Sequence, residues 1–273
     1  MRGGQWGVSP HKDPSSLFLI SLGREAAESG GPAKPPPGPG GPTMPDKVYD
    51  SPAAAIADVP DGATIMFGGF ASAGTPTNLI LALREKGTRD ITAIANNIGL
   101  GDKLDSLCEK KQLRKLIASF AIRASAQRRS LFEQLYANGE VELEVVPQGT
   151  LAERIRAGGA GIPAFFTPTG AGTILAEGKP VQTFDGREYV MERALTADYA
   201  FIRAYKADRL GNLVYRKSGR NFNEVMATAA KVTIAEVEEI VAPGDLDPEH
   251  IVTPSVYVDR IVQGPAHDVR WIN

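Results

Sequence analysis

The sequence predicts an α/β fold, and three observations support that prediction. Short apolar runs recur along the chain, separated by segments whose apolar residues follow helical periodicity. Glycine-rich turns stand between a run and the helix that follows it, most clearly at Gly68-Gly69. Of the 273 residues, 42% are hydrophobic, so a sizeable core can be buried in one large domain or two small ones.

Apolar or alternating runs bounded by turn residues predict the strands. They lie at residues 65–67, 91–95, 113–120, 141–145, 189–191, 199–202, 213–215, 232–237 and 256–258. The run at 141–145 alternates strictly between apolar and acidic residues. That alternation predicts an edge or half-exposed strand, with Glu142 and Glu144 facing solvent.

Capping residues and apolar faces predict the helices. They lie at residues 53–57, 75–86, 125–137 and 150–157. Serine followed by proline at Ser51-Pro52 is a favourable helix start. Thr75-Pro76 opens the second helix and Gly87 ends it. Thr150 with Glu153 three residues later fits a capping box, so we expect the fourth helix to begin at Thr150.

The first part of the chain differs in composition from the rest. Glycine and proline dominate residues 30–42, which can form neither a helix nor a sheet ladder. We therefore expect a disordered extension at 1–44, a globular domain at 45–264 and a tail at 265–273. One hypothesis is that Met44 is the natural start of the protein. The alternative is that the residues before it are a genuine linker or a tag.

Composition excludes several classes of function. The net charge is about -2, with acids and bases spread along the chain, so neither nucleic acid nor an anionic membrane is an expected partner. No apolar run approaches the roughly 18 residues of a membrane span. The apolar patch at Leu17–Leu22 is too short for a secretory signal. We expect a cytoplasmic protein.

Cysteine and histidine are scarce. A disulfide framework is impossible with the one cysteine, Cys108, for which a free thiol is favoured over a nucleophile. The three histidines are His11, His250 and His267, and two of them lie near the ends of the chain. We therefore expect no metal site and no Ser-His-Asp triad.

A glycine-rich stretch at 61–76 is the first candidate for a ligand site. An apolar strand, a loop containing Gly68-Gly69 and a helix start follow one another, which is a common ligand-holding unit in α/β proteins. Glycine allows a ligand to approach the backbone, and the helix start offers unpaired N–H groups. Glycines that serve only to make a bend are the alternative.

Polar residues at two further strand ends are also candidates. Asn96-Asn97 end the strand that begins at Ile91, where ligands sit in open α/β sheets; an ordinary turn is the alternative. Gln148 stands between a strand end and a helix start. Its amide can donate a hydrogen bond beside the positive end of the helix dipole, which suits a developing oxyanion. A plain turn glutamine is the alternative.

Two other patterns are compatible with ligand binding. The basic segment 216–223 could hold a carboxylate or a phosphate, or could be a solvated loop. The pattern Gly159-x-Gly161-x-x-Ala164 matches the spacing of a dinucleotide-binding motif. We reject that interpretation, because the pattern follows a helix and Pro163 would break the helix that it has to open.

The spacing of the glycine-rich stretch resembles the first-subunit motif of family I coenzyme A transferases. All of its defining positions are filled, namely Asp61, Gly62, Gly68, Gly69, Phe70, Gly74 and Pro76. Further stretches resemble the same family, namely 96–97, 147–161, 166–170, 206–208, 211–212, 220–223 and 236–240. The resemblance covers roughly 47–262, and it is to the alpha subunit of the 3-oxoacid coenzyme A transferases.

That resemblance implies a fold and a chemistry. The fold is a single three-layer domain with a mostly parallel sheet, like that of coenzyme A transferases and sugar-phosphate isomerases. The reaction moves CoA from an acyl-CoA, expected to be succinyl-CoA, to a 3-oxo acid such as acetoacetate or 3-oxoadipate. A glutamate attacks the thioester and passes through an anhydride to a glutamyl-CoA thioester. No bound cofactor is implied, because the CoA thioester is itself a substrate.

The resemblance also implies a partner chain. In the family the glutamate lies in a Ser-Glu-Asn-Gly motif of the beta subunit. No Glu-Asn-Gly occurs in this sequence. We therefore expect activity only in a heterodimer or heterotetramer that contains a beta subunit. Alternatives are the alpha subunit of an acetate or short-chain acyl-CoA transferase, and a non-catalytic binding protein of the same fold.

Site residues follow from the matched positions. The resemblance makes Gln148 the oxyanion donor. It places seven residues in the walls of the acyl-CoA pocket, namely Gly68, Gly69, Phe70, Gly74, Pro76, Asn96 and Asn97. The sequence departs from the acetoacetate-type pattern at 121–129, where a Gly-Glu-Asn segment is missing. Arg123 in this segment is the candidate for binding the second carboxyl of a dicarboxylate, and a solvated arginine is the alternative.

Overall fold

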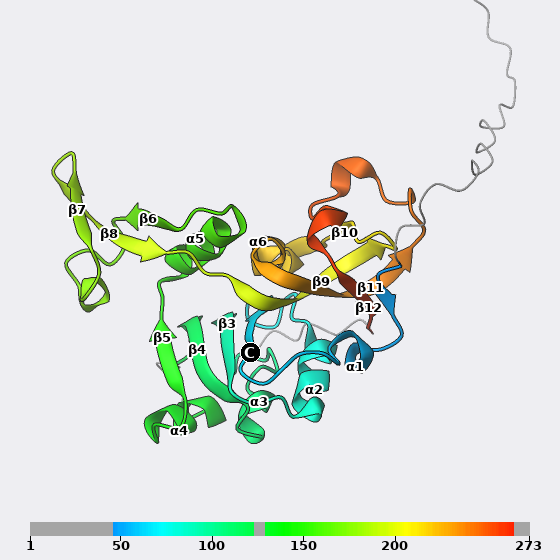
Figure 1. Cartoon of the computed structure of the whole chain (residues 1–273), viewed down its shortest axis with the longest axis horizontal. Coiled ribbons are helices and arrows are strands. Elements are labelled where there is room, and N and C mark those ends of the chain that lie inside the picture. Colours follow the sequence, from blue (N-terminus) through cyan, green and yellow to red (C-terminus); the bar gives the residue numbers. More distant parts are fainter. Residues whose placement is uncertain (1–45, 123–128, 265–273) are drawn as a thin grey trace, which may run out of the picture. The chain divides into compact units, whose positions relative to one another are not determined.

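A computed structural model describes residues 46–122 and 129–264, all within the unit that spans 44–273. A nine-stranded sheet runs through the described residues in the order β1-β12-β11-β9-β2-β3-β4-β5, with β10 paired to β9 (Figure 1). The pairings along that path are parallel, and only β10 is antiparallel. The strands are β1 Val48–Tyr49, β2 Thr64–Phe67, β3 Ile91–Asn97, β4 Leu113–Phe120, β5 Glu142–Val145, β9 Ala197–Asp208, β10 Leu213–Val214, β11 Ala230–Val241 and β12 Arg260–Gln263.

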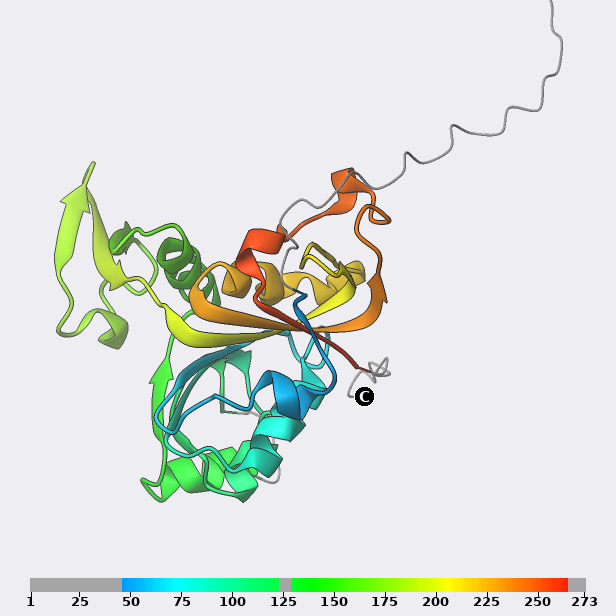
Figure 2. The same cartoon turned by 45° about the vertical axis from the view of Figure 1, so that its right-hand side comes forward.

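Helices cover both faces of this sheet, which makes the three layers that the resemblance implies (Figure 2). On one face pack α1 Pro52–Ala55, α2 Thr77–Lys86, α3 Ser106–Glu109 and α4 Leu131–Ala137. On the other face pack α5 Gln148–Gly159 and α6 Asn221–Ala227. A mostly parallel sheet that is covered on both sides buries both faces of its central strands, and all seven residues of β3 are buried.

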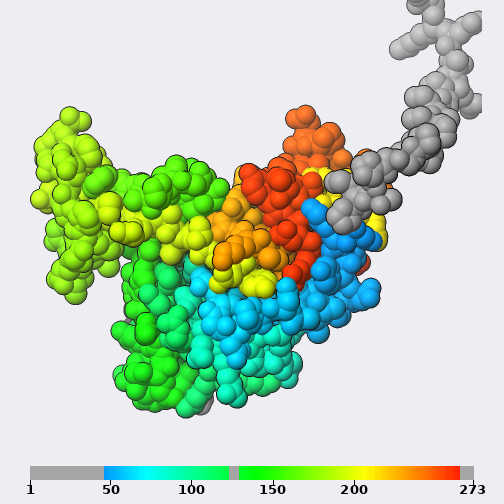
Figure 3. Space-filling view, viewed as in Figure 1, coloured from blue at the N-terminus to red at the C-terminus, as the bar shows by residue number. Residues whose placement is uncertain are grey.

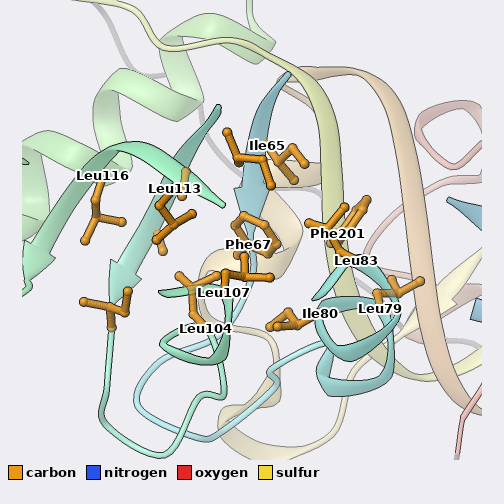
Figure 4. Packing of buried hydrophobic residues seen from close by; sticks show 14 of the residues in the cluster. Ile65, Phe67, Leu79, Ile80, Leu83, Leu104, Leu107, Leu113, Leu116 and Phe201 are labelled. Atoms are coloured by element: carbon orange, nitrogen blue, oxygen red, sulfur yellow. The ribbon is translucent and has the colours of Figure 1, made fainter. Parts of the chain in front are cut away.

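The first core lies between the sheet and α2 (Figure 4). Phe67 of β2 and Phe201 of β9 are neighbours across the parallel pair, and their rings meet edge to face with centroids 5.5 Å apart. Leu79, Ile80 and Leu83 of α2 are fully buried beside them. The (i, i+1, i+4) spacing of these α2 residues puts them on one helix face, which explains why the segment forms an amphipathic helix.

A second, three-stranded sheet is inserted between α5 and β9. It contains β6 Ala164–Thr167, β7 Val181–Phe184 and β8 Arg187–Arg193 in the antiparallel order β6-β8-β7. Asp185-Gly186 form the turn between β7 and β8 with φ values of 49° and 77°, as the Asp-Gly signal predicts. In Figure 3 the yellow-green residues of this sheet stand apart from the neighbouring chain.

Several local predictions are confirmed. Ser51 caps α1 through its side chain, with Pro52 in the first turn. Gly87 ends α2 in the left-handed conformation, with φ 79°. The alternating segment forms β5, which is an edge strand of the large sheet.

Other local predictions are wrong. The fourth predicted helix begins at Gln148 instead of Thr150, and its N-cap is Pro147 without a side-chain cap. The Thr150 hydroxyl is buried and has no hydrogen-bond partner among the described atoms, so the capping box is not formed. The helix predicted over 125–137 lies in part outside the described residues, at 125–128; among the residues that are described, α4 begins at Leu131, where Ser130 and Glu133 form a capping box that the prediction missed.

The predicted strand at 256–258 is also wrong. Residues Ser255–Tyr257 form a short 3-10 helix, η4, and the last strand is β12, which begins at Arg260. Short apolar runs do not distinguish these states, because periodicity over three residues carries little information. The helices α3 and α6 were not predicted, because both are too short to produce a detectable periodic pattern.

Among the described residues, no helix combines the length and the apolar character needed to cross a bilayer.

Candidate active site

The carboxyl ends of the parallel strands bring the candidate residues together. After β2 the chain builds β3, β4 and β5 outward on one side, while β9 and β11 lie on the other side of β2. The boundary between β2 and β9 is therefore the topological switch point of the sheet, where ligands of open α/β sheets bind. Gly68-Gly69 follow β2, Asn96-Asn97 end β3, and Gln148 follows β5.

The loop after β2 is held from one side by Asn97. Its Oδ1 accepts a hydrogen bond from the Ala71 N–H at 2.8 Å, and its Nδ2 donates to the Ala71 carbonyl at 3.3 Å. Ala71 has φ 50° and Gly69 has φ 120°, so the loop needs the left-handed region at both positions. Asn97 thus replaces the sheet partners that these loop backbone groups lack.

The same loop is held from the other side by Asn223, a fully buried residue of α6. Asn223 Nδ2 donates to the carbonyls of Gly74 and Gly219, each at 2.9 Å, and Oδ1 accepts from the Arg203 N–H at 2.9 Å. A Cβ on Gly68 would stand 1.8 Å from Asn223 Oδ1. Glycine at position 68 is therefore required by this contact.

A line of side-chain hydrogen bonds joins the loop to Gln148. Asp102 accepts from Asn97 Nδ2 at 2.5 Å, Asn96 Nδ2 donates to Asn97 Oδ1 at 2.8 Å, and Gln148 Nε2 donates to Asn96 Oδ1 at 2.7 Å. Asn96, Asn97 and Asp102 are buried, and Gln148 is half-buried. These hydrogen bonds determine which amide atom donates and which accepts at each position, and they fix the orientation of the Gln148 nitrogen.

Gln148 can act as a hydrogen-bond donor to a ligand. Its amide nitrogen carries two N–H groups, and Asn96 accepts from that nitrogen at 2.7 Å. Within the described part of the chain, no other acceptor for this nitrogen is found, so one N–H is left for a ligand. Gln148 is also the first residue of α5, where the helix dipole favours negative charge.

Two buried carboxyl groups support the loop. Burial raises the pKa of Asp102, although Asn97 and the backbone N–H groups of Leu100 and Leu104 oppose that effect. Burial likewise raises the pKa of Glu236 on β11, against the opposing charge of Arg203. Glu236 accepts hydrogen bonds from the N–H groups of Asn78 and Leu79, so it caps α2 from another element.

Two cavities lie against the loop: a small one beside Asn96 and Asn97, and a larger one of about 550 Å³. The larger cavity is lined by loop residues 72–75, by β9 residues 203–205, by segment 215–219, and by single residues that include Lys103 and Glu238. The small cavity beside Asn96 and Asn97 shares Thr75 with it.

The other candidate chemistries find no support in the described residues. Burial is the main reason that the pKa of Cys108 rises to about 12, so its thiol stays protonated. No group of three potential metal ligands is found in the described ranges. His250 is exposed beside Asp247, while His11 and His267 lie outside the described residues. The rejected pattern begins at Gly159, the last residue of α5, so it follows a helix and not a strand.

Most of the predicted site residues meet at one edge of the sheet. Gly68, Gly69, Asn96 and Asn97 line the small cavity, Gly74 lines the large one, Phe70 is 46% exposed on the loop, and Pro76 is the N-cap of α2. Arg123 lies outside the described residues. Sequence reasoning missed Asp102 and Arg203, and it included Asn223 only as the end of the segment 216–223, without its role in holding the loop. The signal for Asp102 was its place in the loop after Asn97.

Comparisons with known proteins identify the family. The coenzyme A transferase family matches residues 49–264. The chain is 52% identical over 220 residues to the alpha (A) subunit of 3-oxoadipate CoA-transferase from Pseudomonas putida, covering 80% of this chain and 94% of that protein. It is 48% identical over 226 residues to the alpha (A) subunit of succinyl-CoA:3-ketoacid coenzyme A transferase from Helicobacter pylori strain J99, covering 82% and 95%.

A solved structure agrees at the level of the fold. Glutaconate coenzyme A-transferase from Acidaminococcus fermentans superimposes with a TM-score of 0.71 at 23% identity, over 80% of this chain and 76% of that one. The parallel sheet, the loop after β2 and the amides at its carboxyl edge thus occur in a chain that belongs to the coenzyme A transferase family.

Proposed function

We propose that this chain is the alpha subunit of a CoA transferase that moves CoA from succinyl-CoA to a 3-oxo acid, acetoacetate or 3-oxoadipate. The support is the similarity to two alpha subunits named for these reactions, at 52% and 48% identity over most of their length. CoA thioesters are substrates in this proposal, and the chain works with a beta subunit.

The observation that carries the proposal is the position of the Gln148 amide. It is anchored by Asn96 at 2.7 Å and stands at the positive end of α5. An N–H group fixed before the reaction stabilises negative charge that develops on a thioester oxygen, at no cost of reorganisation. A donor in this place suits acyl transfer.

The proposed chemistry divides between two chains. A glutamate carboxylate from the beta subunit makes the attack on the thioester carbon, and the oxyanion that forms accepts a hydrogen bond from Gln148. Collapse releases CoA thiolate and leaves an acyl-glutamyl anhydride. The thiolate then attacks the glutamyl carbonyl, which releases succinate and gives the glutamyl-CoA thioester. The 3-oxo acid takes CoA by the reverse route.

Coexpression tests the pairing and the substrate. The chain should be inactive alone and active when purified with a beta subunit that carries Ser-Glu-Asn-Gly. Initial rates with succinyl-CoA should be measured against acetoacetate, 3-oxoadipate and acetate. Transfer to acetate alone would replace the proposed acceptor. A stable complex with no transfer to any of the three acids would favour the non-catalytic alternative.

Gln148→Ala tests the role of the amide. We expect kcat of the assembled enzyme to fall by about 10²–10³, as is typical for the loss of one oxyanion donor, with little change in KM for either substrate. Gln134→Ala is the matched control, since that glutamine is exposed on α4, which packs on the opposite face of the sheet from α5. A wild-type kcat in the Gln148→Ala complex would contradict the assignment.

A further inference from the structure

The larger cavity is built at the switch point of the sheet. One wall is the loop after β2, at 72–75, and another is β9 at 203–205. The sheet extends from β2 through β3 on one side and from β9 through β11 on the other. The crevice between the carboxyl ends of β2 and β9 is therefore the expected place for a ligand. At about 550 Å³, the cavity lies within the range of small-molecule sites, roughly 300–1,000 Å³.

The charges that line this cavity are unbalanced. Four cations, namely Lys103, Arg203, Arg216 and Lys217, face one carboxylate, Glu238. Glu238 is already shared, because its oxygens accept from Arg203 at 3.4 Å and from Arg216 at 3.0 Å. Arg216 is held further by stacking over the Tyr205 ring, 4.4 Å from its centroid.

Lys103 and Lys217 are the two cations of this cavity that form no ion pair among the described residues. Neither ammonium group has an acidic partner within the described ranges, and both residues are exposed. Both also have left-handed backbone, with φ values of 63° and 51°, which a lysine adopts only at a cost in energy. Two unpaired lysines from separate segments are therefore held at one cavity by backbone that is unfavourable for them.

We propose that this cavity binds the phosphate groups of the coenzyme A moiety, with Lys103 and Lys217 as the phosphate contacts. This inference rests on the proposed function. A surplus of cations suits several phosphate charges, and lysine binds phosphate as a point charge. A four-carbon dicarboxylate would fill little of about 550 Å³. Thr75 lines both this cavity and the small cavity beside Asn96 and Asn97, so the proposed phosphate site lies next to the strand ends that carry the candidate amides.

Kinetics of the assembled two-chain enzyme test this inference. We expect Lys103→Ala and Lys217→Ala each to raise KM for succinyl-CoA by roughly tenfold, with kcat and KM for the acceptor acid within about twofold of wild type. Lys111→Ala is the matched control, because Lys111 is also exposed with left-handed φ of 51° but lies outside the cavity, paired with Glu140. It should behave as wild type.

A substrate without the 3′-phosphate identifies which phosphate is bound. If the lysine variants no longer raise KM when the substrate is succinyl-3′-dephospho-CoA, the lysines bind the 3′-phosphate. If the variants still raise KM with that substrate, the lysines bind the pyrophosphate. An unchanged KM for succinyl-CoA in both variants overturns the inference, and so does a rise confined to KM for the acceptor acid, which would place a carboxylate in the cavity.

Calorimetric titration of the complex with CoA separates this inference from the proposed function, since it needs no turnover. Weaker CoA binding by the variants upholds the inference even if no acid is accepted. Wild-type binding by both variants overturns it even if transfer is observed. A wild-type complex that does not bind CoA contradicts both.

Discussion

At the scale of single residues, two glycines that look alike in the sequence have opposite environments. Gly68 lies against Asn223, and an added Cβ would stand 1.8 Å from its Oδ1. Gly149, in the first turn of α5, has nothing within 4 Å of the same position. The first glycine is therefore required by packing, and the second only lowers helix propensity.

We expect Gly68→Ala to lower the free energy of unfolding by roughly 1–3 kcal/mol, because Asn223 must move and its hydrogen bonds to the loop are disturbed. Gly149→Ala should raise it by up to about 1 kcal/mol, because alanine favours the helix. Urea unfolding of the full chain measures both. Equal effects of the two substitutions would show that the contact between Gly68 and Asn223 is not formed in solution.

At the scale of elements, α2 takes its N-terminal cap from a distant strand. Its N-cap residue is Pro76, which has no capping side chain, and Glu236 of β11 accepts from the N–H groups of Asn78 and Leu79 at 2.8 and 3.1 Å. Glu236 also accepts from Arg203 at 2.6 Å, and both side chains are buried. The start of α2, and with it the end of the ligand loop, is thus tied to β9 and β11.

We expect Glu236→Ala to lower the free energy of unfolding by roughly 3–5 kcal/mol, since it leaves the Arg203 charge buried and two helix N–H groups without an acceptor. Glu239→Ala on the same strand is the control. That carboxylate is 47% exposed in its pair with Lys206, so its loss should cost about 1 kcal/mol or less. Urea denaturation distinguishes the two, and similar midpoints would rule out the capping role.

At the scale of the whole molecule, ion pairs connect the layers and give stability a pH dependence. Glu144 on edge strand β5 pairs with Lys115 of β4 at 2.7 Å and with Arg154 of α5 at 2.8 Å. Glu144, predicted to face solvent, is thus half-buried and paired, whereas Glu142 is exposed as predicted. Burial alone would raise the pKa of Glu144, but the hydrogen bonds from Arg154 and Lys115 outweigh it and lower that pKa.

A lowered pKa in the folded state means that the unfolded chain binds the proton more tightly. The contribution of Glu144 is therefore present above its ordinary pKa of 4.5, and it is lost as the pH falls through the folded value. We expect Glu144→Gln to be less stable than wild type at pH 7, with the difference shrinking below about pH 4.5. Urea unfolding at several pH values measures this. Glu142→Gln is the control, and a pH-independent deficit in Glu144→Gln would contradict the electrostatic origin.

The sequence predicted more of the fold than of the contacts within the site. Periodicity and glycine spacing located β2, β3, β4, β5 and α2, because these signals are local. They missed α6, which is short, and they placed a strand at 256–258 where η4 lies. The roles of Asp102 and Asn223 could not be predicted, since each depends on an element distant in the sequence.

Two levels of determination can thus be separated. By itself, the sequence determined the α/β class, the family and the three strand ends that carry Gly68, Asn97 and Gln148, because motif spacing and periodicity are properties of short segments. Only the tertiary structure decided that Asn96 orients Gln148, that Glu236 caps α2, and that Lys103 and Lys217 share a cavity. Parallel pairing brings together residues far apart in the chain, and no local pattern records which of them will meet.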